Sequence, residues 1–331
     1  MLVTYLTDPI VLTLALSVGF FVAFTIGAND ETMTPAVGAG LLTLGLAVIL
    51  GGVFNFIGVF FLGEQVSKTV GNNFATETLT LPMVFIILIS MAIWLFIVSL
   101  KGIPISTTQS VVGSVLGIVL IEWGLTAVRL DTLIMVVLSW IISPLIGLIG
   151  GYGSYLIIIR FQQSLKRTGY SDYERQEKFA SYALAFFLLI SVFSRSGNDV
   201  AKAIGPLMAI PEILADPFLA LLAGGLGMCL GVIILGRRVV KKLSQDIVAL
   251  SATSALAASV SVSIIMFIGT LVGIPLSGSH ILVAAFIGVG FVKKEKVDTD
   301  SLKEIGWSWI LTTPASALFS GVIFIIIKLL V

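Results

Sequence analysis

Two short polar motifs carry charged and amide side chains inside an otherwise apolar sequence. Asn29 and Asp30 are followed by Glu31, and the pair recurs as Asn198 and Asp199. A carboxylate inside a lipid bilayer costs between about 2.5 and 17 kcal/mol, so it persists only when it is paired, hydrated or bound to a cation. Amide and carboxylate oxygens are ligands that a hard cation such as Na⁺ prefers. A polar pair that caps a helix at the membrane surface is the alternative interpretation.

Residues that disturb helices flank both pairs. Gly27 and Gly197 precede them and permit an unwound backbone, whereas Pro35 and Pro206 follow and limit where a helix can continue. A broken helix inside a membrane offers free carbonyl oxygens to an ion. We therefore predict a sodium site in broken helices. Its predicted ligands are Asn29, Asp30, Asn198 and Asp199, with Glu31 as an additional ligand or a residue at the mouth of the site.

A second duplicated motif places hydroxyl groups directly after a proline. It reads "PISTTQ" at 104–109 and "PLSGSH" at 275–280, and an apolar stretch follows each copy. Proline and then serine are typical of a helix N-terminus, where unpaired N–H groups and the helix dipole attract anions. Two such ends facing each other would form a cradle for a tetrahedral anion with few fixed charges, although each motif alone also fits an ordinary capped helix. The predicted anion-binding residues are Ser106, Thr107, Thr108, Gln109, Ser277, Gly278 and Ser279.

Two further polar residues, His280 and Lys202, lie in or beside these motifs. His280 is the counterpart of Gln109, so either can line the site as a donor, and a role for His280 in proton coupling is the alternative. Lys202 stands three residues after Asp199, on the same face of any helix. We expect Lys202 to pair with Asp199, and the alternative is that it supplies positive charge to the anion.

The composition indicates that the elements that position these motifs lie in a membrane. The chain has 331 residues, of which 57% are hydrophobic and 11% charged, and its mean hydropathy is +1.11. A soluble domain carries about 25% charged residues. Several apolar stretches are close to twenty residues long, which predicts an integral membrane protein that crosses the bilayer repeatedly. No basic tract indicates nucleic acid, and no nucleophile–base pair or metal cluster indicates an enzyme.

The two halves of the chain resemble each other. Besides the two motifs above, "GGVFNFIGVFFLG" is matched by "GGLGMCLGVIILG", and "SWIISP" by "SWILTTP", about 170 residues further along. Four landmarks in the same order indicate an internal duplication. We assign residues 1–159 to the first repeat, 160–178 to a connecting loop and 179–331 to the second repeat. Glu31 breaks the repeat because Val200 is its counterpart.

The distribution of Lys and Arg predicts how the halves are oriented. Loops 160–178, 236–250 and 293–304 are rich in basic residues and are therefore predicted to be cytoplasmic. The segment 63–80 is equivalent to loop 236–250, yet Lys68 is its only basic residue. Equivalent loops would then lie on opposite sides of a cell membrane, so each half crosses an odd number of times. This is an inverted repeat, as in many secondary transporters, with both termini outside the cytoplasm.

The number of crossings depends on stretches 81–101 and 104–122. If both cross the membrane fully, each half has five spans; if they form a re-entrant hairpin, each half has three. We favour hairpins because their tips would lie near the middle of the bilayer. The predicted fold is an all-α polytopic membrane protein, an inverted-topology repeat with broken helices and re-entrant hairpins.

The motifs "GAND", "GIPISTTQSVVG", "SGNDVAKAIGPL" and "GIPLSGSH", with the repeated "SWI" segments, resemble the PiT family of inorganic phosphate transporters over essentially the whole chain. The resemblance implies phosphate import driven by a Na⁺ or H⁺ gradient, and a homodimer. Some members carry sulfate instead. The family motifs correspond to Asn29/Asp30, Asn198/Asp199, Ser106/Thr107/Thr108 and, less closely, Ser277/Gly278/Ser279.

This chain departs from the family pattern at positions that touch the predicted cation site. "ETMTPAVG" replaces small residues and an Asn after Asp30, Lys202 replaces an Asn, and Gly278 stands where Thr is common. We predict a Na⁺-coupled phosphate importer that works by alternating access, with Na⁺ as coupling ion and no other cofactor. Coupling to H⁺, transport of sulfate and an anion channel are the alternatives. Phosphate is favoured because HPO₄²⁻ has a proton to donate to Asp or Gln oxygens, whereas sulfate has none.

Overall fold

The computed structural model describes residues 9–70, 75–167, 173–210, 213, 216–246, 251–271, 276–294 and 298–330. Within these ranges the chain is helical, and its only strand-like feature is one isolated bridge between Ala75 and Val128. The first half contains α1 (Pro9–Ala28), α2 (Thr34–Gly38), α3 (Leu44–Val70), α4 (Leu81–Leu100), α5 (Thr107–Glu122), the short 3₁₀ helix η2 (Leu125–Ala127) and α6 (Leu130–Arg167).

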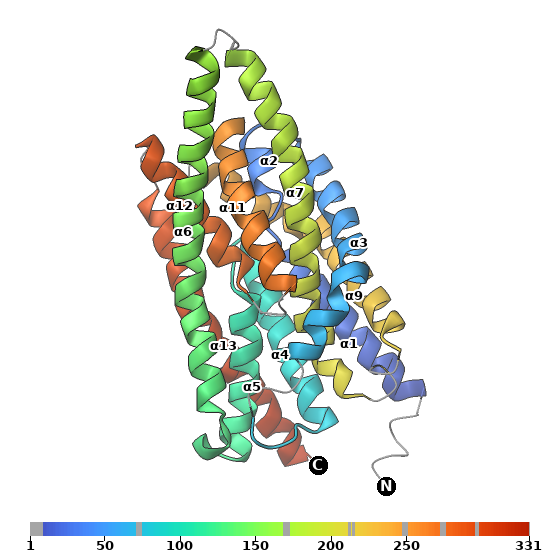
Figure 1. Cartoon of the computed structure of the whole chain (residues 1–331). Helices are drawn as coiled ribbons and strands as arrows, with labels where there is room; N and C mark the ends of the chain where they lie inside the picture. Colours follow the sequence, from blue (N-terminus) through green and yellow to red (C-terminus); the bar gives the residue numbers. More distant parts are fainter. Residues whose placement is uncertain are drawn as a thin grey trace.

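The second half follows a related order. It contains α7 (Tyr173–Ile204), the 3₁₀ helix η3 (Pro206–Ala209), α9 (Phe218–Gly231), the π-helical turn η4 (Val232–Gly236), α10 (Arg237–Asp246), α11 (Ala252–Leu271), α12 (Gly278–Lys293) and α13 (Thr299–Leu330). The beginning of α1 and the end of α13 lie at one end of the molecule (Figure 1). The facing ends of α6 and α7 lie at the opposite end.

Eight helical segments in the described ranges are long and apolar enough to cross a bilayer. The predicted all-α polytopic membrane protein is therefore confirmed. Helices α5 and α12 have 16 residues each. At about 1.5 Å per residue they are shorter than the roughly 30 Å hydrocarbon core.

The pairs α4–α5 and α11–α12 have the shape of hairpins that enter from opposite ends. In Figure 1, α4 and α5 lie in the lower half of the molecule, whereas α11 and α12 lie in the upper half. Helices α4 and α11 are span-length but interior: 61% and 67% of their apolar windows are buried, against 11% in α6. This arrangement agrees with the predicted hairpins. Residues 272–275, which connect α11 to α12 along the chain, lie outside the described residues.

The short hairpin helices pack closely against long helices of the other half. Helix α5 packs against α13, and α12 packs against α6. A methyl group on Gly117 of α5 would collide with the backbone of Ala317, and one on Gly151 of α6 would collide with that of Ala285 in α12. Small residues that let backbones approach are typical of helix contacts in membranes, where apolar burial alone does not drive association.

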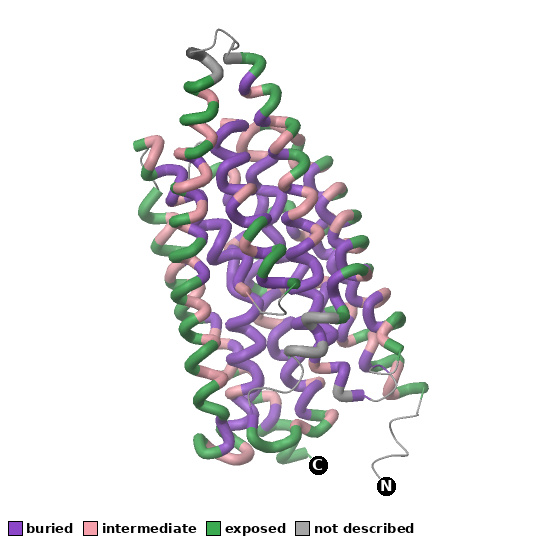
Figure 2. Tube along the Cα trace, viewed as in Figure 1, coloured by how far each residue is buried: buried purple, intermediate pink, exposed green. Residues whose placement is uncertain are grey.

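The first Asn-Asp pair lies in a broken helix, as predicted. Helix α1 ends at Ala28, residues 29–33 are non-helical, and α2 begins at Thr34 with Pro35 in its first turn. The chain therefore changes conformation at Asn29 and Asp30. Buried residues fill the interior of the bundle (Figure 2), and both of these residues are buried.

The prediction of a second broken helix at Asn198 and Asp199 is wrong. Helix α7 continues through this pair and ends at Ile204, just before Pro206, which lacks the N–H that a helix needs. Gly197 does not unwind the chain. A methyl group there would collide with Leu62 of α3, so this glycine permits close packing of two helices instead.

Candidate functional site

The first hairpin tip is held by the side chain of Asn29. Its Nδ2 donates to the carbonyl oxygen of Ile105 at 2.8 Å, and its Oδ1 accepts from the Ile105 N–H at 3.2 Å. Both residues are buried. Ile105 lies outside any helix, so its N–H and carbonyl groups lack the partners that a helix would provide, and the Asn29 amide supplies them. Asn29 therefore positions the segment that leads into α5.

The two hydroxyl motifs meet at the centre of the molecule. Ser279 Oγ, in the first turn of α12, donates to the Ile105 carbonyl oxygen at 3.2 Å. Thr108 Oγ1, in the first turn of α5, donates to the Leu276 carbonyl oxygen at 3.5 Å. The N-termini of α5 and α12 are therefore neighbours, which brings together the residues that the sequence predicts as an anion cradle.

The two helix starts are capped differently. Ser106 Oγ accepts from the Gln109 N–H at 3.3 Å, as an N-cap serine should. Ser277 also occupies the N-cap position but makes no capping hydrogen bond, so the predicted cap is absent there. The side-chain oxygen of Gln109 is buried and accepts no hydrogen bond within the described part of the chain.

Arg195 of α7 connects the carboxylates of both halves. Its Nη1 lies 2.7 Å from Glu31 Oε1 and 4.0 Å from Asp30 Oδ1, and its Nε donates to Asp199 Oδ2 at 2.9 Å. All four side chains are buried. Glu31 is wholly buried, which favours its predicted role as an additional cation ligand over a role at the mouth of the site. Arg195 was not predicted as a site residue, because only the fold brings Glu31 to it.

Lys202 connects this charge cluster to the first hydroxyl motif. Its Nζ lies 2.5 Å from Asp199 Oδ1 and donates to Thr107 Oγ1 at 2.9 Å. The predicted pairing with Asp199 is confirmed. The alternative role has structural support as well, since the same ammonium group contacts a residue of the anion motif.

Asp30 is surrounded by neutral donors. Asn55 Nδ2 donates to its Oδ2 at 2.8 Å, while the Thr32 N–H and hydroxyl donate to its Oδ1 at 2.9 and 2.5 Å. Sequence reasoning missed Asn55. The available signal was a lone amide inside the apolar stretch of α3, but Met228 is its counterpart, so comparison of the halves does not reveal it.

The prediction that the anion cradle has few fixed charges is wrong, because two cationic side chains contact the hydroxyl motifs. Lys202 reaches Thr107 in the first motif, and Arg195 packs directly on Gly278 in the second, where an added Cβ would lie 2.6 Å from the guanidinium carbon. The side chains of Asp30, Glu31, Asp199, Arg195 and Lys202 together carry one net negative charge when all are ionised. Such a cluster in a low-dielectric interior favours one additional cation.

The sodium ligands stay a prediction. No group of three His, Cys, Asp or Glu residues in the described ranges has a geometry that could hold a metal ion. Both oxygens of Asp199 already contact fixed cations, whereas those of Asp30 contact neutral donors. Asn198 is buried beside Asp199 in α7. The two Asn-Asp pairs therefore differ in their surroundings more than their sequences suggest.

His280 lies against an aromatic ring. Its imidazole centroid is 4.0 Å from that of Trp309 in α13, and the side chain is buried. This packing fits a structural role as well as a donor role, and the proposed part of His280 in proton coupling stays untested.

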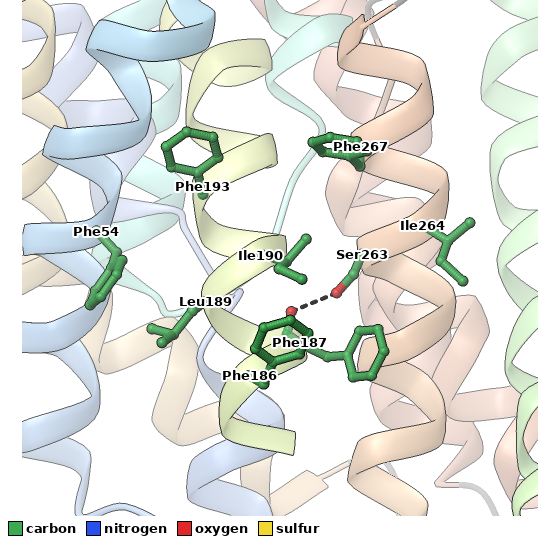
Figure 3. Close-up of a pocket in the computed structure, with 9 residues that line it drawn as sticks. All are labelled: Phe54, Phe186, Phe187, Leu189, Ile190, Phe193, Ser263, Ile264 and Phe267. Carbon is green, nitrogen blue, oxygen red and sulfur yellow. Dashed lines mark hydrogen bonds between the residues drawn. The ribbon is translucent and has the colours of Figure 1, made fainter. Parts of the chain in front are cut away.

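A recess between α3, α7 and α11 is of a different kind (Figure 3). Its lining is apolar except for Ser263, whose hydroxyl donates to the Phe187 carbonyl oxygen at 2.6 Å. Phe186 is 60% exposed at this surface. In a membrane-spanning bundle such surface faces acyl chains, so we assign the recess to the lipid-facing exterior.

The fold and this buried cluster define a polytopic α-helical membrane transporter. The sequence model of the phosphate transporter family matches residues 26–320. The chain belongs to this family, which consists of transporters and not of enzymes, so the predicted family membership is confirmed.

Individual relatives match along almost the whole chain. A candidate phosphate permease of Pyrococcus furiosus is 31% identical over 398 aligned positions, which cover 96% of each chain. One of Thermococcus kodakarensis is 29% identical, with 97% of this chain and 98% of the relative covered. A solved structure of a sodium-dependent phosphate transporter has a TM-score of 0.85 and 27% identity, covering 97% of this chain and all of that one.

Proposed function

We propose that this protein is a secondary active transporter that imports inorganic phosphate together with Na⁺. The observation that carries the proposal is the meeting of two hydroxyl-rich helix N-termini beside a buried cluster with one excess negative charge. Helix N-termini bind anions, and the excess charge needs a cation. One interior position thus favours both ions of a symporter.

The phosphate ligands are the residues at the two helix starts. The two helix starts contact each other through Thr108 and Ser279, and Lys202 adds a positive charge at Thr107. The unpartnered oxygen of Gln109 is an acceptor for the proton of HPO₄²⁻. Sulfate has no such proton and would leave that buried acceptor unsatisfied, so phosphate is favoured. The proposed ligands are Ser106, Thr107, Thr108, Gln109, Ser277, Gly278 and Ser279.

The coupling cation binds at the carboxylates of the same cluster. Asp30 is the best candidate, because its oxygens accept from neutral donors whereas both oxygens of Asp199 are paired with fixed cations. Glu31, whose Oε1 is paired with Arg195, is the second candidate. Asn29 and Asn198 complete the proposed set. Na⁺ is favoured by the likeness to a transporter described as sodium-dependent. A proton on a carboxylate would satisfy the same charge, so H⁺ coupling is the second candidate.

Alternating access follows if the two halves are an inverted repeat. Helix contacts occur in pairs that are related by exchanging the halves. Helix α5 packs on α13 as its counterpart α12 packs on α6, and α1 packs on α9 as its counterpart α7 packs on α3. Rocking the halves about the central hairpin tips would expose the site to each side in turn. We also propose that the basic segments 160–178, 236–250 and 293–304 face the cytoplasm, as their Lys and Arg content suggests; these segments were predicted as loops but contain α10 and the ends of α6, α7 and α13. A homodimer is proposed as well, as the family resemblance implies.

Uptake of radiolabelled phosphate into proteoliposomes tests the function. An inward Na⁺ gradient should drive accumulation above equilibrium, a pH gradient alone should not, and excess sulfate should compete poorly. Accumulation driven only by the pH gradient would favour H⁺ coupling. Phosphate that merely equilibrates under both gradients would indicate a channel and overturn the proposal.

Carboxylate variants identify the cation site. We expect Asp30→Asn to lose Na⁺-driven accumulation, because this change removes one charge that the cation neutralises. Asp298→Asn, at an exposed residue outside the spans, is the control and should transport normally. Unchanged Na⁺ dependence in both Asp30→Asn and Asp199→Asn would show that the cation binds elsewhere.

A further inference from the structure

Lys202 is a wholly buried charged side chain in the middle of a membrane protein. It is 1% exposed and is the largest fully buried side chain among the described residues. An ammonium group at such depth is expensive unless its environment was built for a cation. Lys202 Nζ lies between a carboxylate oxygen of Asp199 and the hydroxyl oxygen of Thr107, at 2.5 and 2.9 Å. These are the oxygen ligands that a bound monovalent cation would use.

The equivalent position in the first half has no charge. Met33 is the counterpart of Lys202, and Asp30, the counterpart of Asp199, accepts from Asn55 and Thr32. In the second half, the cation beside Asp199 is the covalently attached ammonium group of Lys202. In the first half, Asp30 has only neutral donors and, at 4.0 Å, Arg195. The two carboxylates in the repeat are thus not equivalent in their need for a mobile ion.

We propose that Lys202 is a tethered cation that takes the place of one coupling ion. The transporter then carries one mobile cation per phosphate, bound on the side of Asp30 and Glu31, and it would carry two without the lysine. This inference rests on the proposed symport function. The charge of the cluster supports it, because three carboxylates face two fixed cations, Arg195 and Lys202.

The test is the ratio of coupling cation to phosphate, measured with ²²Na⁺ and ³²P-phosphate in the same proteoliposomes. Lys202→Asn removes one positive charge and supplies an oxygen ligand instead. We expect its Na⁺-to-phosphate ratio to rise by one, and Na⁺ activation to become cooperative. Lys202→Arg keeps the charge and should keep the ratio. Lys242→Asn, which removes a lysine paired with Glu304 at the surface, is the matched control and should also keep it.

Two further variants keep the proposal testable if Lys202→Asn fails to fold. Asp199→Asn alone balances the remaining charges, so its phosphate uptake should no longer require Na⁺. Asp199→Asn combined with Lys202→Asn restores one net negative charge, so its ratio should return to that of the native protein. Melting temperatures in detergent identify which variants are folded.

The outcomes separate the two proposals. If the native protein shows no coupled uptake, the proposed function fails. If uptake is coupled but the ratio is the same in the native protein, in Lys202→Asn and in Asp199→Asn, the function stands and Lys202 is a structural ion pair. A native ratio of two cations per phosphate would overturn the tethered-cation proposal directly.

Discussion

The guanidinium group of Arg195 occupies the space that a side chain at position 278 would need. A Cβ built on Gly278 would lie 2.6 Å from both the Cζ and the Nε of Arg195. Gly278 stands where the family resemblance leads us to expect Thr. The glycine therefore gives Arg195 the room to reach Glu31 and Asp199, and the two residues depend on each other.

Replacing Gly278 should disable transport through this contact. Gly278→Ala would push the guanidinium away from its carboxylates, so we expect phosphate uptake to fall more than tenfold and the melting temperature to drop. Gly153→Ala, in the interior of α6 with no atom within 4 Å of the added methyl group, is the control. It should transport normally and be unchanged or up to about 1 kcal/mol more stable. Equal behaviour of the two variants would show that Arg195 moves aside freely.

Arg195 and Glu31 should be strongly coupled in stability. Arg195→Gln leaves Glu31 without its partner and Asp199 with only Lys202, which should cost about 3–5 kcal/mol. Glu31→Gln should cost less, because it removes the charge in excess. The double variant, Arg195→Gln with Glu31→Gln, should lose less stability than the sum of the two single variants, since no unpaired Glu31 carboxylate remains. Thermal unfolding of all four proteins in detergent gives the coupling energy, and additive effects would contradict the ion pair.

Asn29 should affect phosphate affinity through the hairpin tip. Asn29→Ala leaves the buried N–H and carbonyl groups of Ile105 without the amide, at about 1–3 kcal/mol for each group that becomes unsatisfied. We expect a higher KM for phosphate, because the start of α5 loses its position. Asn29→Asp can still accept from the N–H but cannot donate to the carbonyl. We therefore expect the KM of Asn29→Asp, measured from uptake against phosphate concentration, to be no lower than that of the native protein. A native KM in Asn29→Ala would refute the role of Asn29 in positioning the start of α5.

The two N-cap serines offer a matched comparison of stability and binding. Ser106→Ala should lower the free energy of unfolding by about 1 kcal/mol, because Ser106 caps α5. Ser277→Ala should have a smaller effect, because Ser277 makes no capping hydrogen bond. If both bind phosphate, both variants should raise the KM. A change in stability alone for Ser106→Ala would restrict that serine to capping.

Several features of this protein were determined by sequence alone. The long apolar stretches determined the membrane fold, because a bilayer requires about twenty apolar residues in a crossing helix. The duplicated motifs identified the polar residues that the fold gathers at its centre. The pairing of Asp199 with Lys202 was predictable because residues three apart share one face of a helix.

Only the tertiary structure decided how these residues meet. Glu31 reaches Arg195, and Asn55 reaches Asp30, across helices that no local pattern relates. The glycine before the second Asn-Asp pair serves helix packing, although the same residue type also permits unwinding. Sequence periodicity describes neighbours along one helix, whereas the environment of a buried charge depends on every helix packed around it. For that reason the motifs were visible in the sequence, but the contacts of Lys202 with Thr107 and of Arg195 with Gly278 and Glu31 were not.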